Sequence, residues 1–291
     1  MRSLVKFFSL TFILSWTLWI AAAFILQKTA SPTSAQTPIS GLPFLMGTFA
    51  PALVALLLTA QAEGRAGTLA LLRRVIQFPQ GGRWYVFAVA YFALVKLTVA
   101  LLYRVATGAW PAFGHIPVYL LMIAIVVSTP VQAGEEIGWR GYALPRLARH
   151  LGLAPASLLL GVIWASWHLP FFFIPGSDNS GQSFPVYLLA VTALSIPMAW
   201  LYWRTNGSLL LTMLMHSAIN NTAGIVASSA STTSPFSLRT SLVAWLTAAV
   251  LWLFAVYFLI RMRRATLQRD TNSVNEVSSN DRPARATVAM K

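Results

Sequence analysis

The chain has 291 residues, of which 57% are hydrophobic and 10% charged, and its mean hydropathy is +0.66. A composition this apolar cannot cover a soluble globule with polar surface, so lipid must face most of the chain. The net charge of +14 does not indicate nucleic-acid binding, because membrane proteins collect Lys and Arg in their cytoplasmic loops. Cysteine is absent, which excludes disulfides, thiolate metal sites and cysteine nucleophiles.

Long apolar runs predict the fold class. A helix needs about 20 apolar residues to cross the hydrocarbon core, and backbone groups without water favour helix throughout. The first run begins with basic residues, as a signal peptide does, but it is too long for one and is followed by further spans. We therefore predict an all-α, polytopic transmembrane helical bundle of about eight spans, at residues 4–26, 42–61, 84–105, 116–133, 153–174, 185–203, 207–228 and 241–261.

The distribution of basic residues predicts the orientation. Every second connection is rich in Arg or Lys, whereas the connections between them hold little more than Lys28, Arg104, Asp178 and Arg239. This alternation predicts a multi-pass protein of the cell membrane with both termini in the cytoplasm. The basic connections contain Arg2, Lys6, Arg65, Arg73, Arg74, Arg83, Arg140, Arg146, Arg149, Arg204, Arg261, Arg263, Arg264 and Arg269.

The predicted domain organisation is one membrane bundle at residues 1–264 and a cytoplasmic tail at residues 265–291. The tail is polar, poor in aromatic residues and without hydrophobic periodicity, a composition typical of disordered segments. We therefore expect it to be dispensable for chemistry.

Ionisable residues inside the predicted spans are the strongest functional signal. A charge at the bilayer centre costs roughly 2.5–3.5 kcal/mol on insertion scales, so such residues indicate function. They occur in three segments, VQAGEEIGWRGY, WASWH and MHSAINN. The residues singled out are Glu135, Glu136 and Arg140 in the first, Trp164 and His168 in the second, and His216 and Asn220 in the third.

Helical spacing predicts different environments for the two adjacent glutamates. Residues four apart lie on one helix face, so Glu136 can pair with Arg140 while Glu135, rotated by about 100°, points elsewhere. A carboxylate without a cation in a low dielectric is the better proton acceptor. Glu135 is therefore the predicted base, with Glu136 and Arg140 as its support. The same spacing lets His216 and Asn220 aim at one point, where His168 could meet them.

Each of these residues also has a structural interpretation. A His inside a span is often only an interhelical hydrogen-bonding group. Paired acids with an Arg can cap a helix, and Asn220 and Asn221 can bind neighbouring helices together. At the level of the whole protein, two other classes remain open. Glu and His at membrane depth also build proton relays in transporters, and a non-proteolytic scaffold or immunity protein would use the motif residues only to hold the bundle.

The three segments resemble the CAAX protease and bacteriocin-processing family of intramembrane endopeptidases, also called the CPBP or Abi family. The resemblance covers roughly residues 40–230. The family often has Phe where this chain has Trp164, and an aromatic packing role survives that difference. The matching motifs are EExxxR at Glu135, Glu136 and Arg140, an aromatic residue with xxxH at Trp164 and His168, and HxxxN at His216 and Asn220.

The resemblance implies an eight-helix bundle with a conical cavity open to the cytoplasmic side. It implies that Glu135 and His168 activate a water, and that His216 and Asn220 stabilise the oxyanion. The family is usually labelled metalloprotease, so zinc held by Glu135, His168 and His216 is chemically feasible, although a carboxylate alone can also take the proton of water. The implied partners are the lipid bilayer and a peptide or lipidated-peptide substrate, with no nucleic acid.

Overall fold

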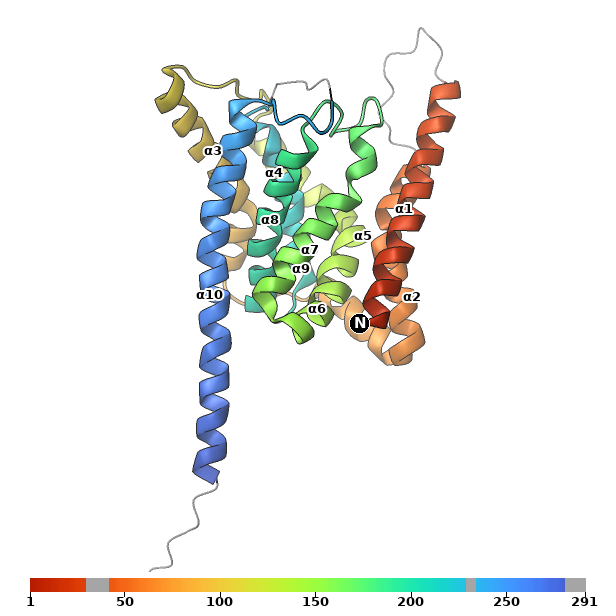
Figure 1. Ribbon diagram of the computed structural model, residues 1–291, viewed down its shortest axis with the longest axis vertical. Coiled ribbons are helices and arrows are strands. Elements are labelled where there is room, and N and C mark those ends of the chain that lie inside the picture. Colours follow the sequence, from red (N-terminus) through yellow and green to blue (C-terminus); the bar gives the residue numbers. More distant parts are fainter. Residues whose placement is uncertain (30–41, 229–233, 281–291) are drawn as a thin grey trace, which may run out of the picture.

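The computed structural model describes residues 1–29, 42–228 and 234–280, and its elements are helices (Figure 1). Within these ranges the only pairing of β type is an isolated bridge between Phe113 and Val226. The predicted all-α class is confirmed. In chain order the elements are α1 (Arg2–Thr29), α2 (Leu42–Arg73), η1 (Arg74–Ile76), α3 (Arg83–Thr107), α4 (Val118–Ser128), η2 (Thr129–Gln132), α5 (Ala133–Glu136), η3 (Ile137–Ala143), α6 (Leu144–Leu151), α7 (Leu153–Trp167), η4 (Leu169–Phe172), α8 (Phe184–Arg204), α9 (Leu209–Thr222), η5 (Ala223–Ile225) and α10 (Leu242–Asn280).

Six stretches of the described chain are long and apolar enough to cross a membrane. The predicted count of about eight is approximate, because the runs at 153–174 and 207–228 form only the shorter helices α7 and α9, of 15 and 14 residues. Each ends in a short 3₁₀ turn, η4 or η5. The six long stretches are Arg2–Ile25, Pro43–Ile76, Arg83–Thr107, Val118–Leu151, Phe184–Arg204 and Leu242–Arg263.

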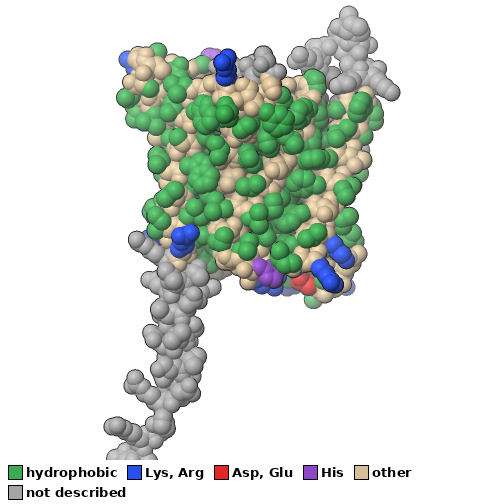
Figure 2. Space-filling model, in the orientation of Figure 1, with side chains coloured by type: hydrophobic (Ala, Val, Ile, Leu, Met, Phe, Trp, Pro, Cys, Tyr) green, Lys and Arg blue, Asp and Glu red, His purple; other side chains and the backbone are tan. Residues whose placement is uncertain are grey.

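The outer surface has the character expected of a protein in lipid. Figure 2 shows hydrophobic side chains spread over the visible face of the bundle, with basic side chains near its two ends. Many large apolar residues are exposed there, among them Ile13, Val86 and Leu253. The chain is therefore a multi-pass membrane protein. Helix α10 is described as far as Asn280, which lies beyond the predicted boundary at residue 264. The division into bundle and tail stays a prediction, and residues 281–291 lie outside the described ranges.

Close helix packing in the interior depends on glycine. Helix α7 packs along α8, and α2 packs against α5 and η3. A Cβ at Gly161 would lie 2.8 Å from Thr192 Cα on α8, and a Cβ at Gly138 would lie 2.7 Å from the carbonyl carbon of Pro51 on α2. Small residues let membrane helices approach closely enough for dispersion contacts to hold them together. Gly138 thus sets the distance between α2 and the segment that carries the two glutamates.

We expect Gly138→Ala to lower the free energy of unfolding by about 1–3 kcal/mol, because the added methyl meets backbone atoms of α2 that cannot rotate away. Gly82→Ala is the matched control, since a Cβ there meets nothing within 4 Å. Thermal unfolding in detergent micelles measures both. Equal melting temperatures for the two variants would contradict this account of the packing.

Candidate functional site

The segment with the two glutamates is an interrupted helix. Between α4 and α6 the chain passes through the 3₁₀ turn η2, one turn of α-helix in α5, and the π-helical segment η3. Pro130 lies in η2 and has no backbone N–H to donate to the preceding turn of α4. Irregular helical turns of this kind occur frequently at functional sites. Glu135 and Glu136 occupy the single regular turn between the two irregular ones.

Glu136 is the centre of a buried charge network. Its Oε1 accepts a hydrogen bond from Arg140 Nη1 at 2.8 Å and lies 2.9 Å from His216 Nδ1. The side chains of Glu136 and Arg140 are both fully buried. The predicted pairing of Glu136 with Arg140 is confirmed, whereas the contact with His216 on α9 was not predicted. Glu136 thus links η3 to α9, because the same carboxylate oxygen contacts a residue of each.

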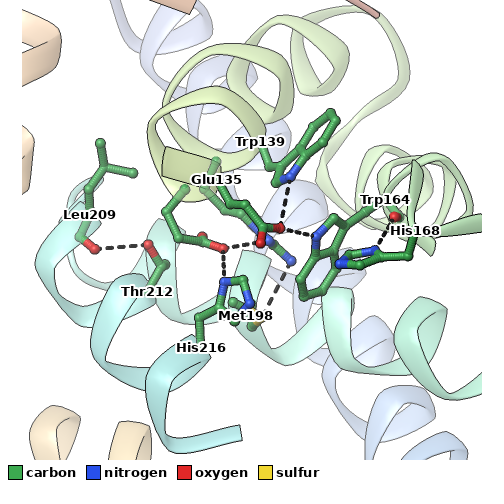
Figure 3. Close-up of polar contacts among 10 residues, drawn as sticks. Glu135, Trp139, Trp164, His168, Met198, Leu209, Thr212 and His216 are labelled. Carbon is green, nitrogen blue, oxygen red and sulfur yellow. Dashed lines mark hydrogen bonds and ion pairs between the residues drawn. The ribbon is translucent and has the colours of Figure 1, made fainter. Parts of the chain in front are cut away.

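Glu135 has different partners, although it is the next residue. Its Oε2 accepts hydrogen bonds from Trp164 Nε1 at 2.7 Å and Trp139 Nε1 at 3.3 Å, as Figure 3 shows. The side chain is buried, and no cation pairs with it within the described chain. The prediction that Glu135 has no ion-pair partner is thus confirmed. The prediction that it is unpartnered is wrong, because two neutral indole groups hold it.

The two histidines are held in similar ways. His168 follows α7 as its C-cap, and its Nδ1 lies 2.9 Å from the carbonyl oxygen of Trp164. Because a carbonyl oxygen can only accept, Nδ1 carries the hydrogen, which leaves Nε2 of a neutral His168 as an acceptor. His216 likewise directs Nδ1 at Glu136. The Trp164 ring lies between them, with centroids 6.0 Å from His168 and 5.2 Å from His216.

Asn220 is the one predicted site residue that makes no polar contact with the others. It lies one helical turn beyond His216 on α9 and is exposed, and no hydrogen bond joins it to another described residue. Its neighbour Asn221 does bind helices together, since its Nδ2 donates to Ser128 Oγ on α4 at 2.9 Å. The structural interpretation offered for these two asparagines therefore fits Asn221 and not Asn220.

The set of residues proposed for zinc does not form a metal site. In the described part of the chain, no three His, Asp or Glu side chains lie close enough together to hold a metal ion. Glu135 Oε2 faces two N–H groups, and the Trp164 indole lies between His168 and His216. These residues therefore do not fit a three-ligand zinc centre in this arrangement, and the label of metalloprotease has no support from their geometry.

Three features of the site could not be read from the motifs. Trp139 and Trp164 act as hydrogen-bond donors, and the Arg140 guanidinium stacks over the Trp164 ring at 4.2 Å. Lys96 lies buried within α3, where it makes no ion pair with another described residue. A single charge in the apolar run YFALVKLTVALL is a signal that the sequence analysis passed over.

A buried carboxylate network and two histidines between membrane-length helices are the groups that a membrane-embedded protease would need. Residues 113–222 match the family model of Type II CAAX prenyl endopeptidase Rce1-like proteins. The chain is also 25% identical over 232 residues to the CAAX prenyl protease 2 of Methanococcus maripaludis, an alignment that covers 74% of this chain and 81% of that protein. Over the part that carries the three motifs, the chain is therefore similar to intramembrane proteases of the CAAX protease and bacteriocin-processing family.

We expect Trp164→Phe to lower the free energy of unfolding by about 1–3 kcal/mol. Phenylalanine keeps an aromatic six-membered ring, but it lacks the indole N–H, so the buried Glu135 loses its shorter hydrogen bond. Trp252→Phe is the matched control, since its Nε1 donates to Leu189 O on the exposed flank of the bundle. Chemical or thermal unfolding in detergent compares the two. The role given to the indole N–H fails if both variants lose the same stability.

Arg140→Ala is expected to destabilise the protein more than Glu135→Ala, by about 3–5 kcal/mol, because it leaves the charge of Glu136 buried and uncompensated. Glu135→Ala removes a carboxylate that is held only by neutral groups. The measurement is the melting temperature of each purified variant. Indistinguishable melting temperatures would show that the ion pair does not support the fold.

Proposed function

We propose that Glu135 is the general base of this CAAX-protease-like intramembrane endopeptidase. The observation that carries the proposal is the division of roles between adjacent carboxylates. Glu136 is neutralised by Arg140 at 2.8 Å, whereas Glu135 is held by two neutral donors. A carboxylate in an apolar site without a cation is the form that takes a proton from water most readily.

His168 would position the attacking water together with Glu135. With Nδ1 donating to Trp164 O, Nε2 is left to accept a hydrogen from the water. Glu135 then removes the other hydrogen, and the oxygen attacks the carbonyl carbon of the scissile peptide bond. The proton held by Glu135 passes to the departing amine nitrogen, so the hydrolysis balances without a further reactant.

His216 and Asn220 would stabilise the oxyanion in different ways. The Asn220 side-chain amide is a donor at any pH. His216 directs Nδ1 at Glu136, which leaves Nε2 as the ring atom that could contact an oxyanion. Glu136 would therefore orient the His216 ring as well as support the fold.

The same geometry supports a mechanism of glutamate type as part of the proposal. Each step above uses groups of the chain itself, and the three residues considered for zinc are not assembled as ligands. The substrate would be a peptide or lipidated peptide cleaved close to the membrane surface. The name of the relative from Methanococcus maripaludis refers to prenyl groups. For this chain, a lipid on the substrate is part of the proposal.

We expect Glu135→Gln to lower the rate of peptide cleavage by about 10²–10⁴-fold, because glutamine keeps the acceptor for the two indoles but cannot take a proton. Glu63→Gln is the control, since Glu63 is a half-exposed acid paired with Arg146. Mass spectrometry of new peptide N-termini, in cells with either variant, measures cleavage and identifies substrates retained by the Gln variant.

Three outcomes separate the candidate classes. A protease loses its new N-termini in the Glu135→Gln form while the melting temperature is kept. A carrier loses coupled ion flux and produces no new N-termini in any form. A scaffold keeps its cellular phenotype in the Glu135→Gln form, and either of these last two results would overturn the proposal.

A further inference from the structure

The end of the bundle that holds the N-terminus is the lower end in Figure 1, and Figure 2 shows basic side chains at that end. This arginine-rich end comprises the start of α1 and α3, the ends of α2 and α8, helix α6, and the part of α10 near Arg263. Contacts between Arg146 and Glu63, and between Arg74 and Tyr202, connect these segments. The basic residues with described side chains at this end are Arg2, Lys6, Arg65, Arg73, Arg74, Arg83, Arg146, Arg149, Arg204, Arg261 and Arg263.

The opposite end carries far less positive charge. Its basic residues are Lys28 at the end of α1, Arg104 at the end of α3 and Arg239 before α10, and it also has the acid Asp178. Short connections rich in Lys and Arg stay in the cytoplasm when a membrane protein inserts. The arginine-rich end is therefore the cytoplasmic end, and both described helical termini lie there.

The contacts that site residues make with helix α1 show how far along the bundle each of them lies. Tyr142, just beyond the glutamates, packs on Phe7 near the start of α1 with ring centroids 4.9 Å apart. Trp167, next to His168, accepts a hydrogen bond from Trp16 Nε1 at 2.9 Å and packs on Trp19. At 1.5 Å per residue, His168 lies about 14–18 Å farther from the cytoplasmic end than Tyr142 does.

Exposure rises in the same direction. Between the glutamates and the arginine-rich end the side chains are buried, since Trp139 and Arg140 are 0% exposed and Tyr142 is 2% exposed. Glu135 is 6% exposed, His168 is partly exposed, and Asn220 is exposed. Asn220 lies 11 residues into α9, which starts at the arginine-rich end. An amide that faced lipid at that depth would be costly, so its exposed face needs a polar opening.

We infer that the candidate catalytic site opens towards the side of the membrane opposite the termini. A cytoplasmic cavity, implied by the family resemblance, and cytoplasmic termini, implied by the basic residues, cannot both hold in this structure. The charge distribution favours the termini. The inferred opening thus lies on the non-cytoplasmic side, whereas the family resemblance implies a cytoplasmic one.

The side on which the site opens limits the substrates that can reach it. This inference about substrates rests on the proposed function. A site that opens outward takes peptide segments that have already crossed the membrane and lie close to its outer surface. Exported peptides and the outer juxtamembrane segments of other membrane proteins have this property. A protein tail that remains in the cytoplasm does not reach Glu135 from the arginine-rich end.

The absence of cysteine makes a direct test available. Ala223→Cys lies in η5 directly beyond the helix of Asn220, and Ala66→Cys lies at the arginine-rich end, and both alanines are exposed. Asn220→Cys and His168→Cys probe the opening itself. Each single-cysteine protein is treated with a membrane-impermeant thiol reagent in intact cells or spheroplasts, and again after lysis, with a melting curve to confirm folding.

We expect Ala223→Cys and at least one opening variant to be labelled in intact cells, and Ala66→Cys only after lysis. Labelling of Ala66→Cys in intact cells would overturn the orientation. If Asn220→Cys and His168→Cys are both labelled only after lysis, or are not labelled at all, the inferred opening is overturned. Glu135-dependent cleavage sites in cytoplasmic segments would overturn the substrate class. If the labelling is as expected and no cleavage depends on Glu135, the proposed protease function fails while the sidedness stands.

Discussion

The arrangement of the site depends on one carboxylate oxygen, Glu136 Oε1, which binds both Arg140 and His216. Desolvating these charges costs several kcal/mol for each ion, and only close pairing compensates that cost. The Arg140 guanidinium also stacks on Trp164 and donates to the sulfur of Met198 at 3.3 Å. The contacts of Glu136 and Arg140 therefore hold η3 against α7, α8 and α9 together.

The same constraint explains why the neighbouring glutamate is available for chemistry. Arg140 is committed to Glu136, and Glu136 Oε2 has no hydrogen-bond partner in the described chain. No cation remains for Glu135, which is held by the N–H groups of Trp139 and Trp164. Indole donors fix the position of a carboxylate without supplying a full positive charge. Different residues thus hold the two carboxylates, since Arg140 and His216 bind Glu136 and the two indoles bind Glu135.

The sequence predicted the parts of this site that follow from local geometry. Helical spacing alone gave the pairing of Glu136 with Arg140, and hydropathy gave the helical class and the approximate spans. The contact of His216 with Glu136 joins residues 80 positions apart, and no periodicity within one helix contains that information. Trp164 was expected to be a packing residue, because a residue type does not reveal whether its N–H meets a buried acceptor. Lys96 was not predicted, because it belongs to none of the three motifs and is a single charge in an otherwise apolar helix.

The lengths of the motif helices explain how polar chemistry is possible at membrane depth. At 1.5 Å per residue, α7 and α9 are about 21–23 Å long, which is shorter than a hydrocarbon core of about 30 Å. Both begin at the arginine-rich end, so both stop before the opposite surface is reached. Their last carbonyl groups have no helical partner and need polar neighbours, which the turns η4 and η5 and the side chain of His168 provide in part. The early ends of both helices on the same side therefore fit the proposed opening, because water and a peptide substrate would have the shortest path to the site from that side.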